Sequence, residues 1–366
     1  MKLLSLLIVS LSFSFSLVAQ NLDRKIQFPD VAGYKTLKCD FHIHTVFSDG
    51  QVWPNIRIEE ALRDGLDAIS LTEHIEYQPW LEDMKHEDRN RSYELAKKYA
   101  KPHDLLIIHG TEITRDMPPG HANALFVQDV NKIMVDDAFE SYKAARAQGA
   151  FIFWNHPNWY AQTKDGIPKL SDFHKNLLEN DLLHGIEVVN DLTYSEEALK
   201  IALEQDIAVI GTSDIHGLID YQFEIANGGH RPIMLVLAKE KTEASIKEAL
   251  FANRTVAWFR NVLSGKAENV RAVIDASLEV INKGMIGDTE VLEIEITNSS
   301  DARYLLQNKS IYDFHADTDI IEVLPHATTK IQVLSVRNGG KNIPLDFEVL
   351  NAKVGYKKSL SWKINL

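Results

Sequence analysis

The amino-acid sequence predicts an α/β fold in which a barrel-like sheet is followed by a small all-β domain. Over residues 37–262, short apolar runs typical of strands alternate with amphipathic runs typical of helices, which indicates a parallel sheet. No glycine-rich dinucleotide loop accompanies the strands, and their number favours closure into a barrel over an open sheet. After about residue 264, short alternating segments are separated by turn clusters, as in an antiparallel sandwich.

The individual elements follow from apolar runs and from the residues that end them. Strands are expected at residues 37–43, 68–72, 105–109, 121–127, 150–154, 185–189, 208–211 and 233–238. Helices are expected at residues 54–64, 89–100, 136–148, 195–205 and 242–251. Pro54 suits the first turn of a helix, whereas Gly65 and Gly149 suit the position just after one.

The C-terminal part reads as short strands with alternating polar and apolar residues. These strands are expected at residues 270–274, 292–296, 329–334 and 359–364, with turn clusters at 298–300 and 338–340. The part contains His315 and His326, but neither belongs to a cluster of potential ligands. We therefore interpret both histidines as ordinary surface or structural residues.

The N-terminus has the pattern of a secretory signal peptide. Lys2 gives a positive start, residues 3–17 are apolar and rich in serine, and residues 18–20 offer a cleavage site after Ala19. We expect a signal peptide at 1–19, a lead-in at 20–36, the barrel at 37–262 and the sandwich at 263–366. The mature protein is then periplasmic or secreted. It has no membrane span, because no other stretch reaches the ~20 apolar residues required; a retained N-terminal anchor is the alternative.

Charge and cysteine content limit the partners and the sources of stability. The formal net charge of −13 repels polyanions, so a nucleic-acid surface is not expected. A small anionic substrate can still be held by a local cluster of metal cations. Cys39 is the lone cysteine and cannot form an internal disulfide, so stability depends on the core and on bound metal. The sequence does not predict the oligomeric state.

A His-x-His pair at the end of the first expected strand suggests half of a metal site. His42 and His44 are two residues apart, and side chains two apart on a strand point to the same side. Neutral imidazole is a common ligand for transition metals. Asp49 follows in a turn with Gly50, from which its carboxylate could reach the same place. Alone, the pair is a weak signal, and two histidines that serve the core are the more common explanation.

The same residue types recur where the other expected strands meet their loops. Each of them, if buried alone, would need its own hydrogen-bond partner, whereas bound metal ions explain them together. All are histidines or carboxylates, and they are His42, His44, Asp49, His74, Glu112, His121, His156, Asp214 and His216. His/carboxylate ligands suit zinc, manganese or iron. Trp53, Trp80, Trp154 and Trp159 lie near these segments and either pack or wall a pocket.

These motifs resemble the PHP family, the polymerase and histidinol phosphatase metal hydrolases. The resemblance covers about residues 37–260, and the motifs occur in order as His42-Ile43-His44 with Asp49, Thr72-Glu73-His74, Gly110-Thr111-Glu112, Gly120-His121, Asn155-His156-Pro157 and Asp214-Ile215-His216. Many members have Asp where this chain has Glu73, and some have His where it has Asp49. The signal peptide and the sandwich also resemble secreted bacterial PHP phosphodiesterases.

The resemblance implies a distorted (β/α)₇ barrel of the TIM type with two to three divalent metal ions. By motif, the first metal would be held by His42, His44, Glu112 and Asp214, the second by Glu112, His121 and His156, and the third by Asp49, His74 and His216. Glu112 would bridge two metals, with a general base as its alternative role. Asp214 is a candidate general acid. Arg115, and more weakly Arg231, are candidates for binding a substrate phosphate.

The expected activity is that of a secreted metal-dependent phosphoesterase, with phosphodiesters preferred over monoesters. Metal-activated water would be the nucleophile, because metals can acidify water and stabilise a phosphoryl group during displacement. The chain shows no local signature of a serine or thiolate nucleophile. Two alternatives stay open: an amide or lactone hydrolase with the same metal site, and a metal-loaded binding protein.

Overall fold

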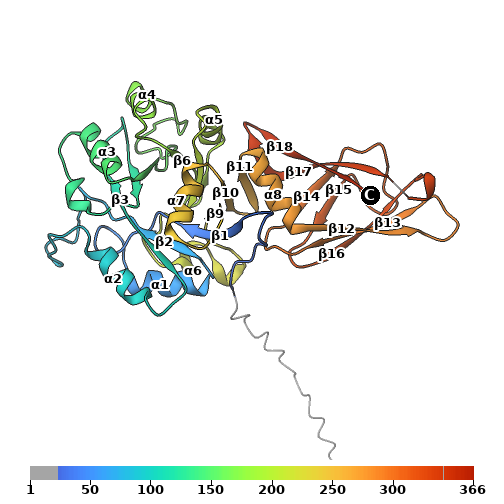
Figure 1. Ribbon diagram of the computed structural model, residues 1–366, viewed down its shortest axis with the longest axis horizontal. Helices are drawn as coiled ribbons and strands as arrows, with labels where there is room; N and C mark the ends of the chain where they lie inside the picture. The colour runs from blue at the N-terminus through green and yellow to red at the C-terminus, as the bar shows by residue number, and fades with distance from the viewer. Residues whose placement is uncertain (1–23, 341) are drawn as a thin grey trace, which may run out of the picture.

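The computed structural model describes residues 24–340 and 342–366. The expected signal peptide and residues 20–23 of the lead-in lie outside the described residues. Figure 1 shows an α/β part, blue to yellow, beside an elongated C-terminal β part, orange to red. None of the helices in the described ranges has the length and apolar character needed to cross a membrane.

The α/β part is a curved sheet surrounded by helices, and its strand order follows the expected barrel. Its strands are β1 (Lys35–Asp40), β2 (Ala68–Leu71), β3 (Leu106–Ile113), β4 (Ala122–Leu125), β5 (Phe151–Trp154), β6 (Gly185–Asn190), β7 (Thr193–Tyr194), β8 (Ala208–Thr212), β9 (Ile233–Ala238) and β10 (Thr255–Phe259). They pair in the order β10-β9-β1-β2-β3-β4-β5-β6, and β8 pairs with β6. Since β8 also packs beside β9 and β10, the sheet closes into a distorted barrel.

The sheet is mixed, so the expectation of a parallel sheet was wrong in part. β1–β2–β3 and β5–β6–β8 are parallel, but β4 runs antiparallel to both of its neighbours and β9 runs antiparallel to β1. A parallel connection needs a crossover of about a dozen residues or more. The link between β3 and β4 spans only residues 114–121, which forces the antiparallel turn.

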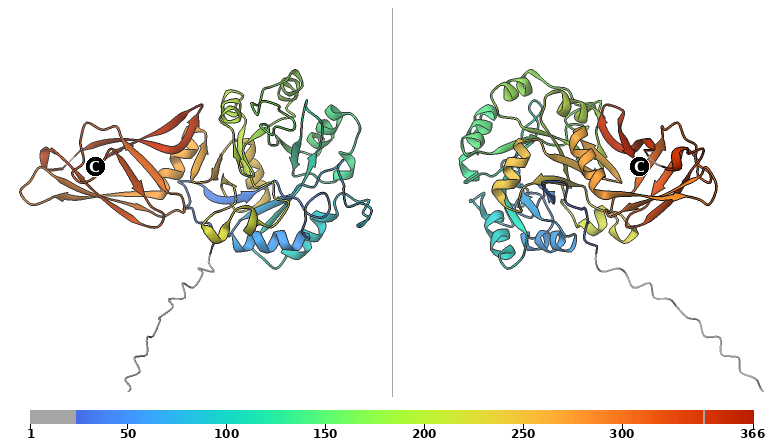
Figure 2. Two further views of the ribbon diagram at one scale, coloured as in Figure 1. Left: turned by 180° about the vertical axis from the view of Figure 1, so that it is seen from behind. Right: turned by 45° about the vertical axis from the view of Figure 1, so that its right-hand side comes forward.

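The helices cover the outside of the barrel, as Figure 2 shows from two sides. They are α1 (Pro54–Arg63), α2 (Arg91–Ala100), α3 (Ala138–Ala147), α4 (Asp172–Glu179), α5 (Glu196–Glu204), α6 (Ile219–Gln222) and α7 (Glu243–Phe251), with single turns η1 (Val130–Lys132) and η2 (Ile225–Asn227). Side-chain caps begin several of them: Asp137, Ser195 and Thr242 each accept a backbone N–H from three residues ahead. The sequence analysis missed α4, whose Ser171 and His174 form a capping box.

The C-terminal part is a two-sheet β domain joined to the barrel through a shared strand. Its elements are β11 (Val262–Gly265), α8 (Ala267–Ser277), β12 (Leu278–Met285), β13 (Leu292–Asn298), β14 (Tyr304–Asn308), β15 (Ile320–Val323), β16 (Thr328–Val333), η3 (Asn338–Gly340), β17 (Pro344–Gly355) and β18 (Lys358–Asn365). One sheet has the order β12-β13-β16. In the other, β11 pairs antiparallel with β10 and parallel with β17, so the barrel sheet continues into the β domain.

One expected strand of this region is a helix. Residues 270–274 lie within α8, where Val270, Val273 and Ile274 are buried together with Ser277. Their spacing of three and four residues is that of one helix face, and the five-residue segment was too short to distinguish this period from alternation. The helix packs against the second sheet, where the Trp362 indole donates to Asp275 over 2.8 Å.

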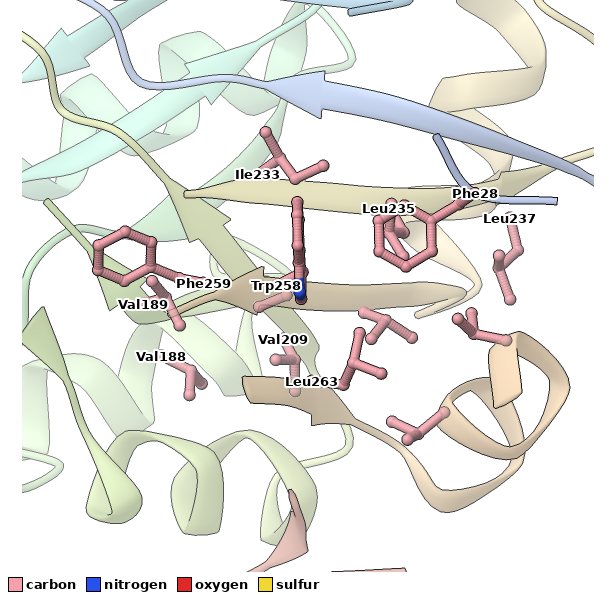
Figure 3. Close-up of a cluster of buried hydrophobic side chains, with 14 of the residues drawn as sticks. Phe28, Val188, Val189, Val209, Ile233, Leu235, Leu237, Trp258, Phe259 and Leu263 are labelled. Carbon is pink, nitrogen blue, oxygen red and sulfur yellow. The ribbon is translucent and has the colours of Figure 1, made fainter. Parts of the chain in front are cut away.

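The core continues from the barrel to the junction with the β domain. Figure 3 shows some of its members there, among them Ile233, Leu235 and Leu237 of β9, Trp258 of β10 and Leu263 of β11. Phe28 from the lead-in meets Trp258 edge-on, with 5.1 Å between ring centroids.

An open cavity of about 890 Å³ lies on the surface at the junction of the two parts. Its lining includes Phe259 and Arg260 from the barrel and Arg303 and Leu324 from the β domain, but no residue of the expected metal ligands.

Several histidines outside the expected metal site are buried in their neutral form, and His184 shows why. Its Nδ1 accepts the backbone N–H of Ile152 at 2.9 Å, and its Nε2 donates to the carbonyl of Asp181 at 3.1 Å. Burial lowers the pKa of His184 from 6.5 to about 4. A proton added at Nδ1 would displace the Ile152 N–H, so the fold resists protonation at this position.

His184→Gln should make the protein less sensitive to acid. Between pH 6.5 and 4 the unfolded chain binds a proton that the folded state excludes, so wild-type stability falls as the pH drops through this range. The slope contributed by one such histidine is about 1.4 kcal/mol per pH unit. Urea unfolding in EDTA, at neutral pH and at about pH 4.5, should show a smaller loss in the variant. The exposed His103→Gln is the control; parallel losses in His184→Gln and wild type would contradict the prediction.

Candidate metal centre

The nine expected ligands come together at one end of the barrel. His42 and His44 follow β1, His74 follows β2, His156 follows β5, and Asp214 and His216 follow β8. His121 stands just before β4. Since β4 is antiparallel to its neighbours, its start lies at the same end of the barrel as the ends of the parallel strands. The strand directions therefore explain why residues from opposite strand termini meet.

Glu112 lies at the centre of this cluster and is fully buried. Its Oε2 is 3.3 Å from His42 Nε2, 3.4 Å from His44 Nε2 and 3.0 Å from His74 Nδ1. Its Oε1 is 2.9 Å from His121 Nδ1 and 3.6 Å from His156 Nε2. Each carboxylate oxygen thus faces its own group of histidines, which is the arrangement that a ligand shared between two cations requires.

The potential donor atoms form four overlapping groups, each with its atoms within 4.8 Å of one another. The groups are His44/Asp49/His74/His216, His42/His44/Asp214, His42/Glu112/His156 and His74/Glu112/His121. All nine residues are used, and the groups share members. The division differs from the motif-based one, because His121 and His156 fall into different groups. His44 also stands with Asp49 and His216, and His74 also stands with Glu112.

Unsatisfied atoms inside the cluster fit the binding of cations. His44 Nε2 and Asp214 Oδ1 are buried without a hydrogen-bond partner among the described residues, although they lie 3.1 Å apart. Burial, reinforced by His216, lowers the pKa of His44 to about 3, so Nε2 keeps its lone pair. Burial alone would raise the pKa of Glu112, but His74 and His42 hold it well below its usual range. Burial alone would lower the pKa of His42 and His74, but the neighbouring carboxylates raise it, so these imidazoles would release protons on binding a divalent transition metal.

The backbone at two of these residues adopts a conformation that non-glycine residues rarely take. His156 has a φ of 29° and Asp214 a φ of 48°. Such left-handed conformations cost about 1–2 kcal/mol per residue. Strain of this kind concentrates at functional sites, where the surrounding structure holds it in place.

Glu187 on β6 orients two of the histidines and was missed by the sequence analysis. Its Oε1 accepts Nδ1–H of His42 at 2.8 Å and the hydroxyl of Thr212 at 2.5 Å. Its Oε2 accepts the backbone N–H of His156 at 2.6 Å and the amide of Asn190 at 2.8 Å. The bond to Nδ1 leaves Nε2 of His42 as the free donor atom that faces Glu112. A glutamate inside the apolar strand 185–190 was the available signal.

A buried arginine, Arg57 on α1, joins the segment after β1 to the segment after β8, and together these carry five of the nine residues. It donates to the carbonyls of His44 at 2.9 Å and His216 at 2.8 Å, and it pairs with Glu60 at 2.8 Å. Glu60 in turn accepts the backbone N–H of Ile219 at 3.0 Å. The amphipathic pattern of the helix gave no sign that this arginine points inward.

Gly50 allows the turn carrying Asp49 to lie against the end of β1. A Cβ atom on Gly50 would lie 2.6 Å from the His44 carbonyl carbon and from the Thr45 nitrogen, which no side chain can tolerate. The close approach places Asp49 Oδ1 3.2 Å from His216 Nε2, and Oδ2 3.4 Å from His74 Nε2.

The two candidate phosphate-binding arginines pair with carboxylates that are not among the nine residues. The Arg115 guanidinium pairs with Glu76 at 3.0 Å and donates to the Val135 carbonyl and the Ser141 hydroxyl, and within the described chain these contacts include none of the nine residues. Arg231 is fully buried between Asp40 and Asp64, at 3.1 and 2.9 Å.

Glu73, where many relatives have Asp, supports the turn rather than His74. It accepts hydrogen bonds from Thr45 and Ser48. His74 instead has its Nδ1 2.7 Å from the Thr114 hydroxyl.

Comparisons with known proteins match both parts of the chain. A PHP domain model matches residues 40–286, and an Ig-like domain model matches residues 278–365. A solved two-domain protein from Bacteroides vulgatus, described as containing a predicted PHP-like metal-dependent phosphoesterase, is 39% identical with a TM-score of 0.88; the match covers 93% of this chain and 98% of that one. An uncharacterized protein of Methanocaldococcus jannaschii is 35% identical over 83 residues, which are 23% of this chain and 36% of that protein.

Glu187→Gln should weaken metal binding without unfolding the barrel. The amide keeps the size of the side chain but loses the charge that holds Nδ1–H of His42, and such outer partners typically contribute about 10-fold to 100-fold to metal affinity. Competition with a fluorescent chelator measures the affinity, and circular dichroism checks the fold. Exposed Glu204→Gln is the matched control. Wild-type affinity in a folded Glu187→Gln variant would show that Glu187 does not orient the ligands.

Proposed function

The chain belongs to the PHP domain family, and on that premise we propose that it is a metal-dependent phosphoesterase whose substrates are phosphodiesters. The observation that carries the proposal is the position of Glu112, a buried carboxylate with a separate group of histidines at each oxygen. Such an arrangement serves cations placed side by side, as in enzymes that clamp a phosphoryl group.

We assign two to three divalent ions, of zinc, manganese or iron, to this cluster. Glu112 is the shared ligand, with His121 and His156 near its Oε1 and with His42, His44 and His74 near its Oε2. Ions held there would supply the Lewis acidity that acidifies water and offsets phosphoryl charge. Asp214 is the better candidate for proton transfer, because its side chain is 14% exposed whereas that of Glu112 is inaccessible. Because the Glu112 side chain is inaccessible, it is a poor candidate for a general base that contacts the substrate.

The charges around the cluster support a diester as the substrate. The ion pairs of Asp49, Glu112 and Asp214 within the described chain are all with histidines. Positive charge at the cluster would then come mainly from bound ions, and a diester carries less negative charge than a monoester. The net charge of −13 opposes a polyanionic nucleic acid. The amide or lactone hydrolase alternative would use the same cluster, so only a substrate panel separates it.

We also propose that the protein is exported and that all catalytic groups belong to the barrel. The proposal of export depends on the charged, apolar and small-residue pattern of residues 1–19. N-terminal sequencing of periplasmic material should begin near Gln20. An intact Met1 on protein recovered from the cytoplasm would contradict export.

Glu112→Gln should lose bound metal and diester hydrolysis together. The substitution removes the charge that balances two cations, so we expect fewer ions per chain and a rate lower by about 10²–10³-fold on bis(p-nitrophenyl) phosphate. Elemental analysis and initial rates on the same preparation measure both, with p-nitrophenyl phosphate and p-nitrophenyl acetate completing the panel. The exposed Glu179→Gln should behave as wild type.

Three results would overturn the proposal or the role of Glu112 in it. A Glu112→Gln variant with its full metal content but slow turnover would make Glu112 a base instead of a shared ligand. Wild-type hydrolysis of the acetate but not of the diester, or diester hydrolysis that withstands chelation, would exclude a metal-dependent phosphodiesterase.

A further inference from the structure

Half-exposed aromatic side chains stand directly against the metal centre. Trp159 is 41% exposed, Trp80 43% and Tyr77 52%. Single exposed aromatic residues are common on protein surfaces and need no special explanation. These three differ because each one contacts a residue of the metal centre or the backbone beside one, and because they come from two separate loops.

Trp159 flanks the Oε1 side of Glu112. Its ring centroid is 5.3 Å from that of His156 and 5.9 Å from that of His121, at interplanar angles of 77° and 64°. The backbone of the same turn fixes it: Trp159 donates to the His156 carbonyl at 2.9 Å, and Gln162 and Thr163 donate back to the Trp159 carbonyl. The indole is therefore held at the histidines and still leaves about two fifths of its surface to solvent.

Tyr77 and Trp80 flank the other side. Tyr77 lies edge-on to His74, with 5.8 Å between ring centroids. The Trp80 indole donates to the carbonyl of Gly50, next to Asp49, at 3.2 Å. Aromatic surface is thus available on both sides of the cluster, where the ion pairs that Asp49, Glu112 and Asp214 make with described residues are all with histidines.

We propose that the site selects phosphodiesters in which at least one esterified group is a flat aromatic ring system, and that Trp159 is the specificity-determining residue that stacks against it. The proposal rests on the proposed function and names its substrate class. An exposed indole beside the reacting phosphate offers a face to a planar group, whereas a saturated group of equal size gains only apolar contact. Stacking of one base on one aromatic side chain is of the size that changes affinity by about 10-fold or more.

The test measures binding rather than turnover. Calorimetric titration of metal-loaded protein with diphenyl phosphate and with dicyclohexyl phosphate compares a flat and a saturated ring of similar size. We expect wild type to prefer the diphenyl ester, Trp159→Ala to lose about 10-fold in affinity for it with little change for the dicyclohexyl ester, and Trp159→Phe to keep most of the preference. Tyr160→Ala is the matched control, since this neighbouring ring is 79% exposed. Metal content is measured for every variant.

The outcomes test the role of Trp159 separately from the proposed phosphodiesterase activity. Equal affinity for the two esters in wild type, equal losses for both in Trp159→Ala, or loss of metal from that variant would overturn the role of Trp159. Hydrolysis of a diester by wild type would leave the proposed function standing in those cases. A stacking preference without any diester hydrolysis would instead support the ring site and reject the phosphodiesterase.

Discussion

The burial of the Glu112 carboxylate is the constraint on which this end of the barrel depends. A charge removed from water is costly unless opposite charge or donors surround it. Here the compensation comes from histidines on the connections after β1, β2 and β5 and just before β4, so no single loop could provide it. The barrel holds residues as far as 70 positions from Glu112 in sequence within hydrogen-bonding distance, or little more, of this one carboxylate.

Buried polar residues just outside the cluster hold the expected ligand residues in position. Glu187 determines which nitrogen of His42 faces the cluster, and Arg57 ties the segment after β1 to the segment after β8. The left-handed backbone of His156 is held in part by its N–H bond to Glu187. Because Gly50 has no side chain, the turn that carries Asp49 can approach the backbone of His44 and Thr45. The strain at the site is therefore compensated by buried polar contacts just outside it.

The sequence predicted the fold class and the family because both depend on local patterns. Apolar runs bounded by glycine and proline located most strands, and the order of the histidine and carboxylate motifs indicated the PHP family, which the comparisons confirmed. What failed depended on tertiary context. The direction of β4 follows from the length of one loop, and residues 270–274 are helical because of the face they bury.

The residues that support the site were harder to recognise than its expected ligands. Glu187 and Arg57 occupy positions that single-sequence patterns assign to an ordinary strand and an ordinary helix. Only the neighbours that the fold brings to them reveal their roles. Arg115 stays a prediction: its distance of three residues from Glu112 in sequence suggested a place at the site, and in the structure its guanidinium pairs with Glu76.

The double pairing of β11 has a consequence for how the molecule comes apart. β11 forms backbone hydrogen bonds with β10 on one side and with β17 on the other. Separating either part from β11 would therefore leave unpaired backbone groups along a sheet edge. The two parts should then unfold in a single cooperative transition and not as independent domains. A protein fragment that begins or ends within β11 would expose an unpaired strand edge that can pair with other chains. For this reason the Ig-like part is poorly suited to exchange as an independent module.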